Sequence, residues 1–166
     1  FGGAKNHMIV MPDADIDQAV DALIGAGYGS AGERCMAISV AVPVGKKTAD
    51  TLIEKLIPRV ESLKIGPSHD PQADYGPMVT KAHMNKVRDY VETGIKEVAK
   101  LLVDGRNFKL QGYENGNFMG GCLFDDVKPD MTIYKDEIFG PVLSIVRTQS
   151  FDEAIKLVNN HAYGDG

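Results

Sequence analysis

One short window of the sequence combines a nucleophile with residues that could activate it. Cys35 lies in the segment Ser30-Ala31-Gly32-Glu33-Arg34-Cys35-Met36-Ala37. A free cysteine is most often a small buried hydrophobe, so its reactivity must be argued from its surroundings. Here the glycines leave room for a substrate, Arg34 adds positive charge that favours a thiolate, and the window precedes a predicted strand. We therefore take Cys35 as a candidate nucleophile, and Cys122 as a core residue because it lacks these features.

The glycines before Cys35 also match a phosphate-binding pattern. Gly27-Tyr28-Gly29-Ser30-Ala31-Gly32 reads G-x-G-x-x-G. In dinucleotide-binding proteins this pattern follows a strand and opens a helix. Here a predicted helix comes first, so the context is wrong. The pattern favours a flexible transition from helix to loop that brings the backbone close to another segment.

A second window, Lys135-Asp136-Glu137-Ile138-Phe139-Gly140-Pro141-Val142, holds a carboxylate and an aromatic ring. On physical grounds alone it is a turn that leads into a buried strand. Glu137 would then be a solvated carboxylate and Phe139 a core aromatic. By itself, this window does not indicate a function.

The elements that must position these residues follow from hydrophobic periodicity. Short apolar runs predict strands at 7–11, 37–44, 101–103 and 142–146, and a strand or strand pair within 118–127. Helical spacing predicts helices after Asp15, from Thr48 with a kink or break at Pro58, from Thr80, and after a capping box at Ser150 and Glu153. Strands that alternate with helices predict an α/β fold with a mainly parallel sheet flanked by helices.

Composition excludes several classes of protein. The 166 residues suit one domain, and 43% hydrophobic with 25% charged residues is ordinary globular composition. The net charge of −5 argues against nucleic acid or an anionic membrane surface as a partner. Two cysteines are too few for a disulfide framework, which predicts a reducing compartment. The four histidines show no zinc-site spacing with cysteine, so we expect no metal.

Together, the two windows resemble the NAD(P)-dependent aldehyde dehydrogenases. Gly32-Glu33-Arg34-Cys35 is followed much later by Glu137-Ile138-Phe139-Gly140-Pro141-Val142, and Gly76-Pro77 and Asn159 to Gly164 match the family's order of landmarks. Three segments resemble its acylating, coenzyme-A-dependent branch, which acts on methylmalonate and malonate semialdehyde: Gly3-Ala4-Lys5-Asn6-His7, Met11-Pro12-Asp13-Ala14-Asp15 and Gly32 to Ala37. The resemblance implies that residues 1–166 are the cysteine-bearing catalytic domain, truncated and without the dinucleotide-binding domain.

The resemblance also implies roles for individual residues. Cys35 would be the nucleophile, Glu137 would hold the nicotinamide ribose, and Phe139 would position the nicotinamide ring. NAD would be the cofactor and coenzyme A the acyl acceptor. Phe1 occupies the place of the glutamate base of hydrolytic members, which favours thiolysis by coenzyme A. For Arg34 we weigh a surface arginine against a clamp for the substrate's carboxylate, whose shape a guanidinium matches.

The chain begins at Phe1 without a methionine and ends in a turn-forming stretch, so we expect a piece of a longer protein. Such a piece alone would show little or no dehydrogenase activity. The complete protein would be a homo-oligomer of the cytoplasm, or of the mitochondrial matrix in a eukaryote. Alternatives are another semialdehyde dehydrogenase of the same family, a cysteine hydrolase or acyltransferase that needs no nicotinamide, and a non-catalytic assembly module.

Overall fold

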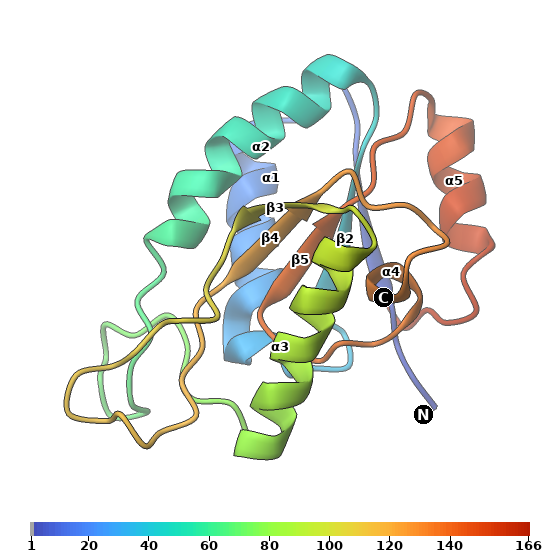
Figure 1. Cartoon of the computed structure of the whole chain (residues 1–166). Helices are drawn as coiled ribbons and strands as arrows, with labels where there is room; N and C mark the ends of the chain where they lie inside the picture. Colours follow the sequence, from blue (N-terminus) through green and yellow to red (C-terminus); the bar gives the residue numbers. More distant parts are fainter. Residues whose placement is uncertain (1) are drawn as a thin grey trace.

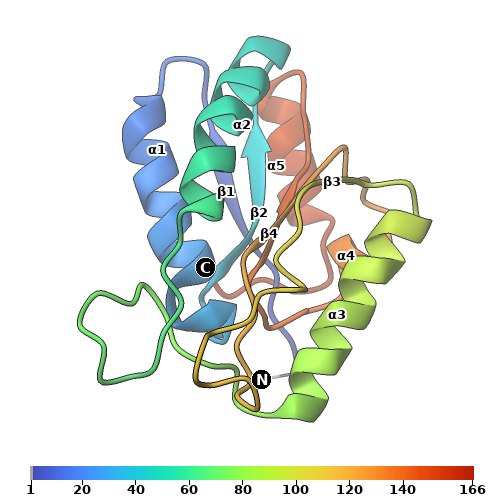
Figure 2. The same cartoon turned by 60° about the vertical axis from the view of Figure 1, so that its left-hand side comes forward.

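In the computed structural model, which describes residues 2–166, a five-stranded sheet lies between two layers of helices (Figures 1 and 2). The strands are β1 (Asn6–Val10), β2 (Ile38–Pro43), β3 (Lys100–Val103), β4 (Cys122–Asp125) and β5 (Val142–Ile145). The helices are α1 (Ile16–Leu23), α2 (Lys46–Glu61), α3 (Lys81–Lys96), α4 (Thr132–Lys135) and α5 (Phe151–Asn159). A π-helical turn (Ile24–Tyr28) and a 3-10 turn (Gly29–Gly32) follow α1.

The sheet has the order β1-β2-β5-β4-β3 and is mainly parallel, as predicted. Only the β3–β4 pair is antiparallel. Helices α1 and α2 cover one face, and α3, α4 and α5 lie on the other (Figure 2). Strands β4 and β5 are buried along their whole length because helices cover both faces of the sheet. Among residues 2–166, no helix combines the length and the apolar character that a membrane crossing requires.

Local capping explains where three helices begin. The Asp15 side chain accepts hydrogen bonds from the backbone N–H groups of Asp17 and Gln18 at the start of α1. Thr80 Oγ1 caps α3 through a hydrogen bond from the backbone N–H of residue 83, at 3.1 Å. Ser150 Oγ caps α5 in the same way, at 3.2 Å. Each cap satisfies backbone donors that the first helical turn leaves free, so these starts could be predicted from sequence.

Two predictions about the elements hold only in part, because no break occurs at Pro58 and the strand within 118–127 is shorter than that segment. Helix α2 continues as a single element past Pro58 to Glu61, because its last turn still closes with a 3.0 Å hydrogen bond from Ser62 N–H to the Pro58 carbonyl. Within 118–127, only Cys122–Asp125 pairs as a strand. The preceding segment is diverted because the Gly120 N–H donates to the Gly105 carbonyl, at 2.9 Å, instead of to a neighbouring strand.

The parallel strands all start on the same side of the sheet, and the candidate residues lie there, at the amino-terminal ends of the strands. Asn6 opens β1, Cys35 precedes β2, and Glu137 and Phe139 precede β5. Because β1, β2 and β5 are neighbours in the sheet, these three approaches lie side by side. In most open α/β sheets, ligands bind at the opposite edge, outside the carboxyl ends of the strands. Here the loops that enter the strands form the candidate site.

Candidate active site

The two windows meet through a backbone contact between Gly32 and Gly140. Gly32 has a φ of +70°, and a Cβ atom at this position would overlap the Gly140 carbonyl oxygen and lie 2.6 Å from its carbonyl carbon. A side chain at Gly140 would collide with Val87 of α3, at 2.7 Å. The glycine pattern thus allows close backbone packing, as predicted, rather than binding a phosphate. It brings the loop of Cys35 against the loop of Glu137.

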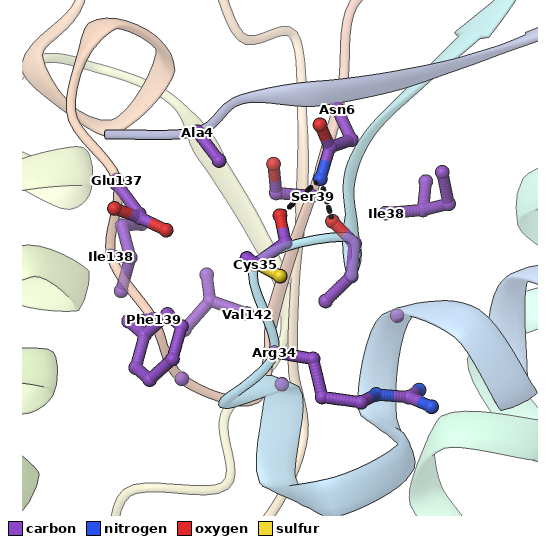
Figure 3. A pocket seen from close by; sticks show the side chains of 14 residues that line it. Ala4, Asn6, Arg34, Cys35, Ile38, Ser39, Glu137, Ile138, Phe139 and Val142 are labelled. Carbon is purple, nitrogen blue, oxygen red and sulfur yellow. Dashed lines mark hydrogen bonds between the residues drawn. The ribbon is translucent and has the colours of Figure 1, made fainter. Parts of the chain in front are cut away.

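Cys35 is exposed and lines a pocket that Glu137 and Phe139 also line (Figure 3). It lies in a tight turn that a 3.1 Å hydrogen bond from the Ala37 N–H to the Arg34 carbonyl closes. Cys122 is a contrast, because it is fully buried and burial raises the pKa of its thiol to about 12. Of the two thiols, therefore, only Cys35 faces a site where a substrate could reach it.

A buried lysine holds the loop that carries Glu137. Lys5, only 1% exposed, donates from Nζ to the carbonyl oxygens of Ile133 and Asp136, both at 2.8 Å. Burial lowers the pKa of its ammonium to about 8, although the nearby Asp136 and Glu137 carboxylates favour the charged form. Two carbonyl partners compensate for removing the ammonium from water. Lys5 therefore fixes the segment that leads to Glu137.

Phe139 adopts a left-handed backbone conformation, with a φ of +57°. Non-glycine residues rarely adopt this conformation, so the surroundings must hold it. His83 of α3 does so by donating from Nε2 to the Phe139 carbonyl at 2.6 Å, and its ring meets the Phe139 ring edge to face. On the other side, the Glu33 carboxylate accepts from the Val79 N–H just before α3, and burial raises its pKa. Helix α3 thus braces both loops.

The Arg34 side chain points away from Cys35 in Figure 3. Its Nη2 donates to the Gly25 carbonyl at 2.8 Å, and the guanidinium packs against Gly29. The side chain is exposed, and one hydrogen bond uses only one of its five N–H donors. The backbone of Arg34 therefore lies beside the nucleophile, while its charge rests on the helical turn that precedes it.

Two histidines and a tyrosine form a separate cluster next to this site. His7 Nε2 lies 2.9 Å from the Tyr134 hydroxyl, and the His161 ring packs edge to face on both. Burial and the neighbouring His161 lower the pKa of His7 to about 4, so the ring is neutral near pH 7. Neither histidine lines the pocket of Cys35. Their place in the structure is that of packing residues.

The pocket combines an exposed thiol, a carboxylate that can accept hydrogen bonds, and an aromatic ring. In the part of the chain that the structure describes, no group of three or more side chains could hold a metal ion. Lys5, Asn6 and His83 support the loops. The sequence placed Lys5 and Asn6 in a segment that resembles the acylating branch, but it indicated no role for any of the three, because their partners are backbone carbonyls distant in sequence. Phe1, which matches the place of a glutamate base, lies outside the described residues.

Comparisons with known proteins identify the family of this chain. The model of the aldehyde dehydrogenase family matches residues 2–166. Malonate-semialdehyde dehydrogenase of Pseudomonas aeruginosa is 58% identical over 166 residues, which cover all of this chain and 33% of that protein. The rat methylmalonate-semialdehyde/malonate-semialdehyde dehydrogenase, described as acylating and mitochondrial, is 48% identical over 99% of this chain and 30% of its own length.

Solved structures show the same fold. A crystal structure from Sinorhizobium meliloti 1021, in complex with NAD, is 69% identical with a TM-score of 0.98 and covers 100% of this chain and 34% of its own. Methylmalonate-semialdehyde dehydrogenase from Oceanimonas doudoroffii is 51% identical with a TM-score of 0.96, over 99% of this chain and 34% of its own. The chain thus spans about a third of the length of these relatives. The chain belongs to the aldehyde dehydrogenase family.

Proposed function

We propose that this chain is the cysteine-bearing catalytic domain of an enzyme that oxidises methylmalonate or malonate semialdehyde to an acyl-coenzyme A. The observation that carries the proposal is the pocket in which Cys35, Glu137 and Phe139 meet. Relatives named for these semialdehydes, 58% and 48% identical over essentially the whole chain, support the substrate class. Because the chain spans only about a third of those relatives, the activity is proposed for the complete protein.

Cys35 acts as the nucleophile in this proposal. Its thiolate forms a bond to the aldehyde carbon, and the carbonyl π electrons move to the oxygen, which gives a thiohemiacetal. The backbone N–H of Cys35 stabilises the negative oxygen. Loss of hydride from the same carbon re-forms the C=O bond and leaves a thioester on Cys35. The thiolate of coenzyme A then attacks the thioester, and the Cys35 thiolate leaves. When a β-carboxylate leaves the acyl group as CO₂, the electron pair of the broken C–C bond stays on the adjacent carbon as a thioester enolate, and this carbon then takes a proton from water.

The pocket suits a nicotinamide nucleotide beside the thiol. Glu137 is half-buried and its carboxylate can accept hydrogen bonds from both hydroxyls of a ribose. The half-buried Phe139 ring offers an apolar surface next to it for a planar ring. NAD, when bound, supplies the acceptor for the hydride. Lys5 and His83 keep the Glu137–Phe139 loop in place for this binding.

Arg34 is proposed as the clamp for the carboxylate of the substrate. A planar guanidinium binds a carboxylate through two parallel hydrogen bonds, and the carboxylate and aldehyde of these semialdehydes are close together. The exposed side chain is held by the single hydrogen bond to Gly25, so it can rotate toward the pocket by giving up one contact. Such an exposed hydrogen bond contributes about 1 kcal/mol, which two charge-assisted bonds would replace.

The test measures NADH formation by the complete enzyme with methylmalonate semialdehyde, with and without coenzyme A. We expect a single-turnover burst without coenzyme A and continued turnover with it. Cys35→Ser should abolish both phases, whereas the matched variant Cys122→Ala should keep them. Rapid continued turnover without coenzyme A would refute the acylating reaction. Thioester turnover that needs no nicotinamide would identify a cysteine hydrolase or acyltransferase instead.

A further inference from the structure

The buried side chain of Asn6 forms hydrogen bonds to the turn that carries the nucleophile Cys35. Asn6 is 1% exposed, and its Nδ2 donates to the carbonyl of Cys35 at 2.7 Å and to that of Ala37 at 2.9 Å (Figure 3). Its Oδ1 accepts from the Gly166 N–H at 2.9 Å. Both side-chain donors are thus used on the same turn, on the carbonyl of the nucleophile itself and on that of the second residue after it.

The limit of the pairing between β1 and β2 explains why a side chain, and not the backbone, holds the turn of Cys35. Strands β1 and β2 pair regularly from His7 onward, but the register shifts between Asn6 and His7, where Asn6 is opposite Ile38. Pairing of β2 with β1 therefore starts at Ile38, directly after the turn that carries Cys35, and does not include the turn. The Asn6 amide continues the hydrogen bonding past this point, because its planar NH₂ group can serve two carbonyl oxygens at once.

Lys5, the residue before Asn6, forms hydrogen bonds to the segment that leads into the opposite wall of the pocket. Lys5 binds the carbonyls of Ile133 and Asp136, which lead into the loop of Glu137. Lys5 and Asn6 are consecutive, and a trans peptide fixes their Cα atoms about 3.8 Å apart. Two neighbouring residues of one buried segment therefore hold both walls, and the spacing between the walls depends on this segment.

We propose that Asn6 is a positioning residue that sets the direction of the Cys35 side chain toward the carbon it attacks. The inference rests on the proposed function of Cys35 as the nucleophile. Asn6 lines the same pocket, but both of its side-chain N–H donors are used on the turn, so it acts through the Cys35 carbonyl. Without its amide, the carbonyls of Cys35 and Ala37 lose the hydrogen bonds from Nδ2, while the bond from the Ala37 N–H to the Arg34 carbonyl remains. Misplacement of a reacting group by about 1 Å can slow a reaction about 100-fold.

The experiment compares two variants of the complete enzyme with its parent. Asn6→Asp replaces the donor NH₂ by an oxygen that repels both carbonyls, and Asn6→Ser retains a single, shorter donor. The matched control is Asn85→Asp, which makes the same chemical change at an exposed position of α3. Rapid mixing gives the rate of the NADH burst, and steady-state kinetics give KM for NAD and for the semialdehyde. Hydrogen exchange of the peptide 34–37 reports on the turn without any turnover.

We expect the burst to slow about 10- to 100-fold in Asn6→Asp and less in Asn6→Ser, with both KM values within about threefold of the parent. Exchange at 34–37 should be at least about tenfold faster, and Asn85→Asp should change neither. A burst within about twofold of the parent in both Asn6 variants, unchanged exchange, or a loss confined to KM would overturn the proposal. A parent enzyme without a burst would refute the proposed function, while faster exchange would still support Asn6 as the anchor.

Discussion

Gly32→Ala is the substitution that most directly tests how the two walls of the pocket meet. The new methyl group would lie 2.6 Å from the Gly140 carbonyl carbon, whereas carbon atoms pack at about 3.5–4.0 Å. Restoring a normal contact requires the Cys35 loop to move away from the Glu137 loop by about 1 Å. The Gly140 side has little room to yield, because even a Cβ atom added at Gly140 would lie only 2.7 Å from Val87 of α3.

The Gly32→Ala substitution has two calculable consequences, one for stability and one for the rate of the NADH burst. Alanine at a φ of +70° costs about 1–2 kcal/mol from backbone conformation alone. A domain of 150–250 residues loses roughly 2–4 °C of Tm per kcal/mol, so the Tm of the longer complete enzyme should fall by no more than roughly 2–8 °C. A 1 Å displacement of the thiol from the position of the hydride acceptor should slow the NADH burst about 100-fold. The variant should therefore remain folded at the assay temperature and still give a much slower NADH burst.

The measurement pairs burst kinetics with thermal unfolding of the same preparations. Gly25→Ala is the control, because a Cβ atom at Gly25 has no neighbour within 4 Å and this residue lies in the same run of glycines. We expect Gly25→Ala to keep the parental burst and a similar Tm. A Gly32→Ala enzyme that remains folded and gives the parental burst rate would refute the idea that this glycine contact sets the geometry of the pocket.

Three further variants test other parts of the site. Arg34→Leu should raise KM for methylmalonate semialdehyde about tenfold or more but leave KM for propanal nearly unchanged, since only the former has a carboxylate; equal effects would remove the clamp. Glu137→Gln should weaken NAD binding about 10- to 100-fold in a fluorescence titration, because hydrogen bonds to a charged acceptor contribute about 1.5–3 kcal/mol; unchanged affinity would exclude a ribose contact. His7→Gln should reduce the loss of stability between pH 6.5 and 4, because the unfolded chain takes up a proton on His7 there while the folded protein does not, its pKa being about 4. For this partly exposed ring the effect is about 1–2 kcal/mol in urea unfolding at the two pH values, and parallel curves for parent and variant would contradict it.

The sequence was sufficient for features that depend on neighbouring residues. The caps at Asp15, Thr80 and Ser150 act within one helical turn, so their residue types predict where α1, α3 and α5 begin. Strand β2 and the parallel sheet also follow from apolar runs between helices. The pairing of Cys35 with Glu137 came from a family resemblance, because no local pattern indicates that β5 lies beside β2.

The remaining features depend on partners distant in sequence. Lys5 and Asn6 are polar and would be expected at the surface, yet both are 1% exposed. Their burial is favourable only because backbone carbonyls on distant loops accept their hydrogen bonds. A kink or a break was expected at Pro58, but α2 does not break there. A proline removes only one hydrogen bond, and burial of Leu56 and Val60 on either side holds the helix together.

The position of β5 has a consequence for the newly made protein. β5 is the last strand along the chain but is inserted between β2 and β4. Roughly 100 residues separate Cys35 from Glu137, and a ribosome needs about 5–20 s to add them. During that time the edge of β2 that pairs with β5 is unpaired, and Cys35 lies beside an incomplete sheet. Until β5 docks, the Cys35 thiol can react with oxidants and electrophiles before the pocket that would direct its chemistry has formed.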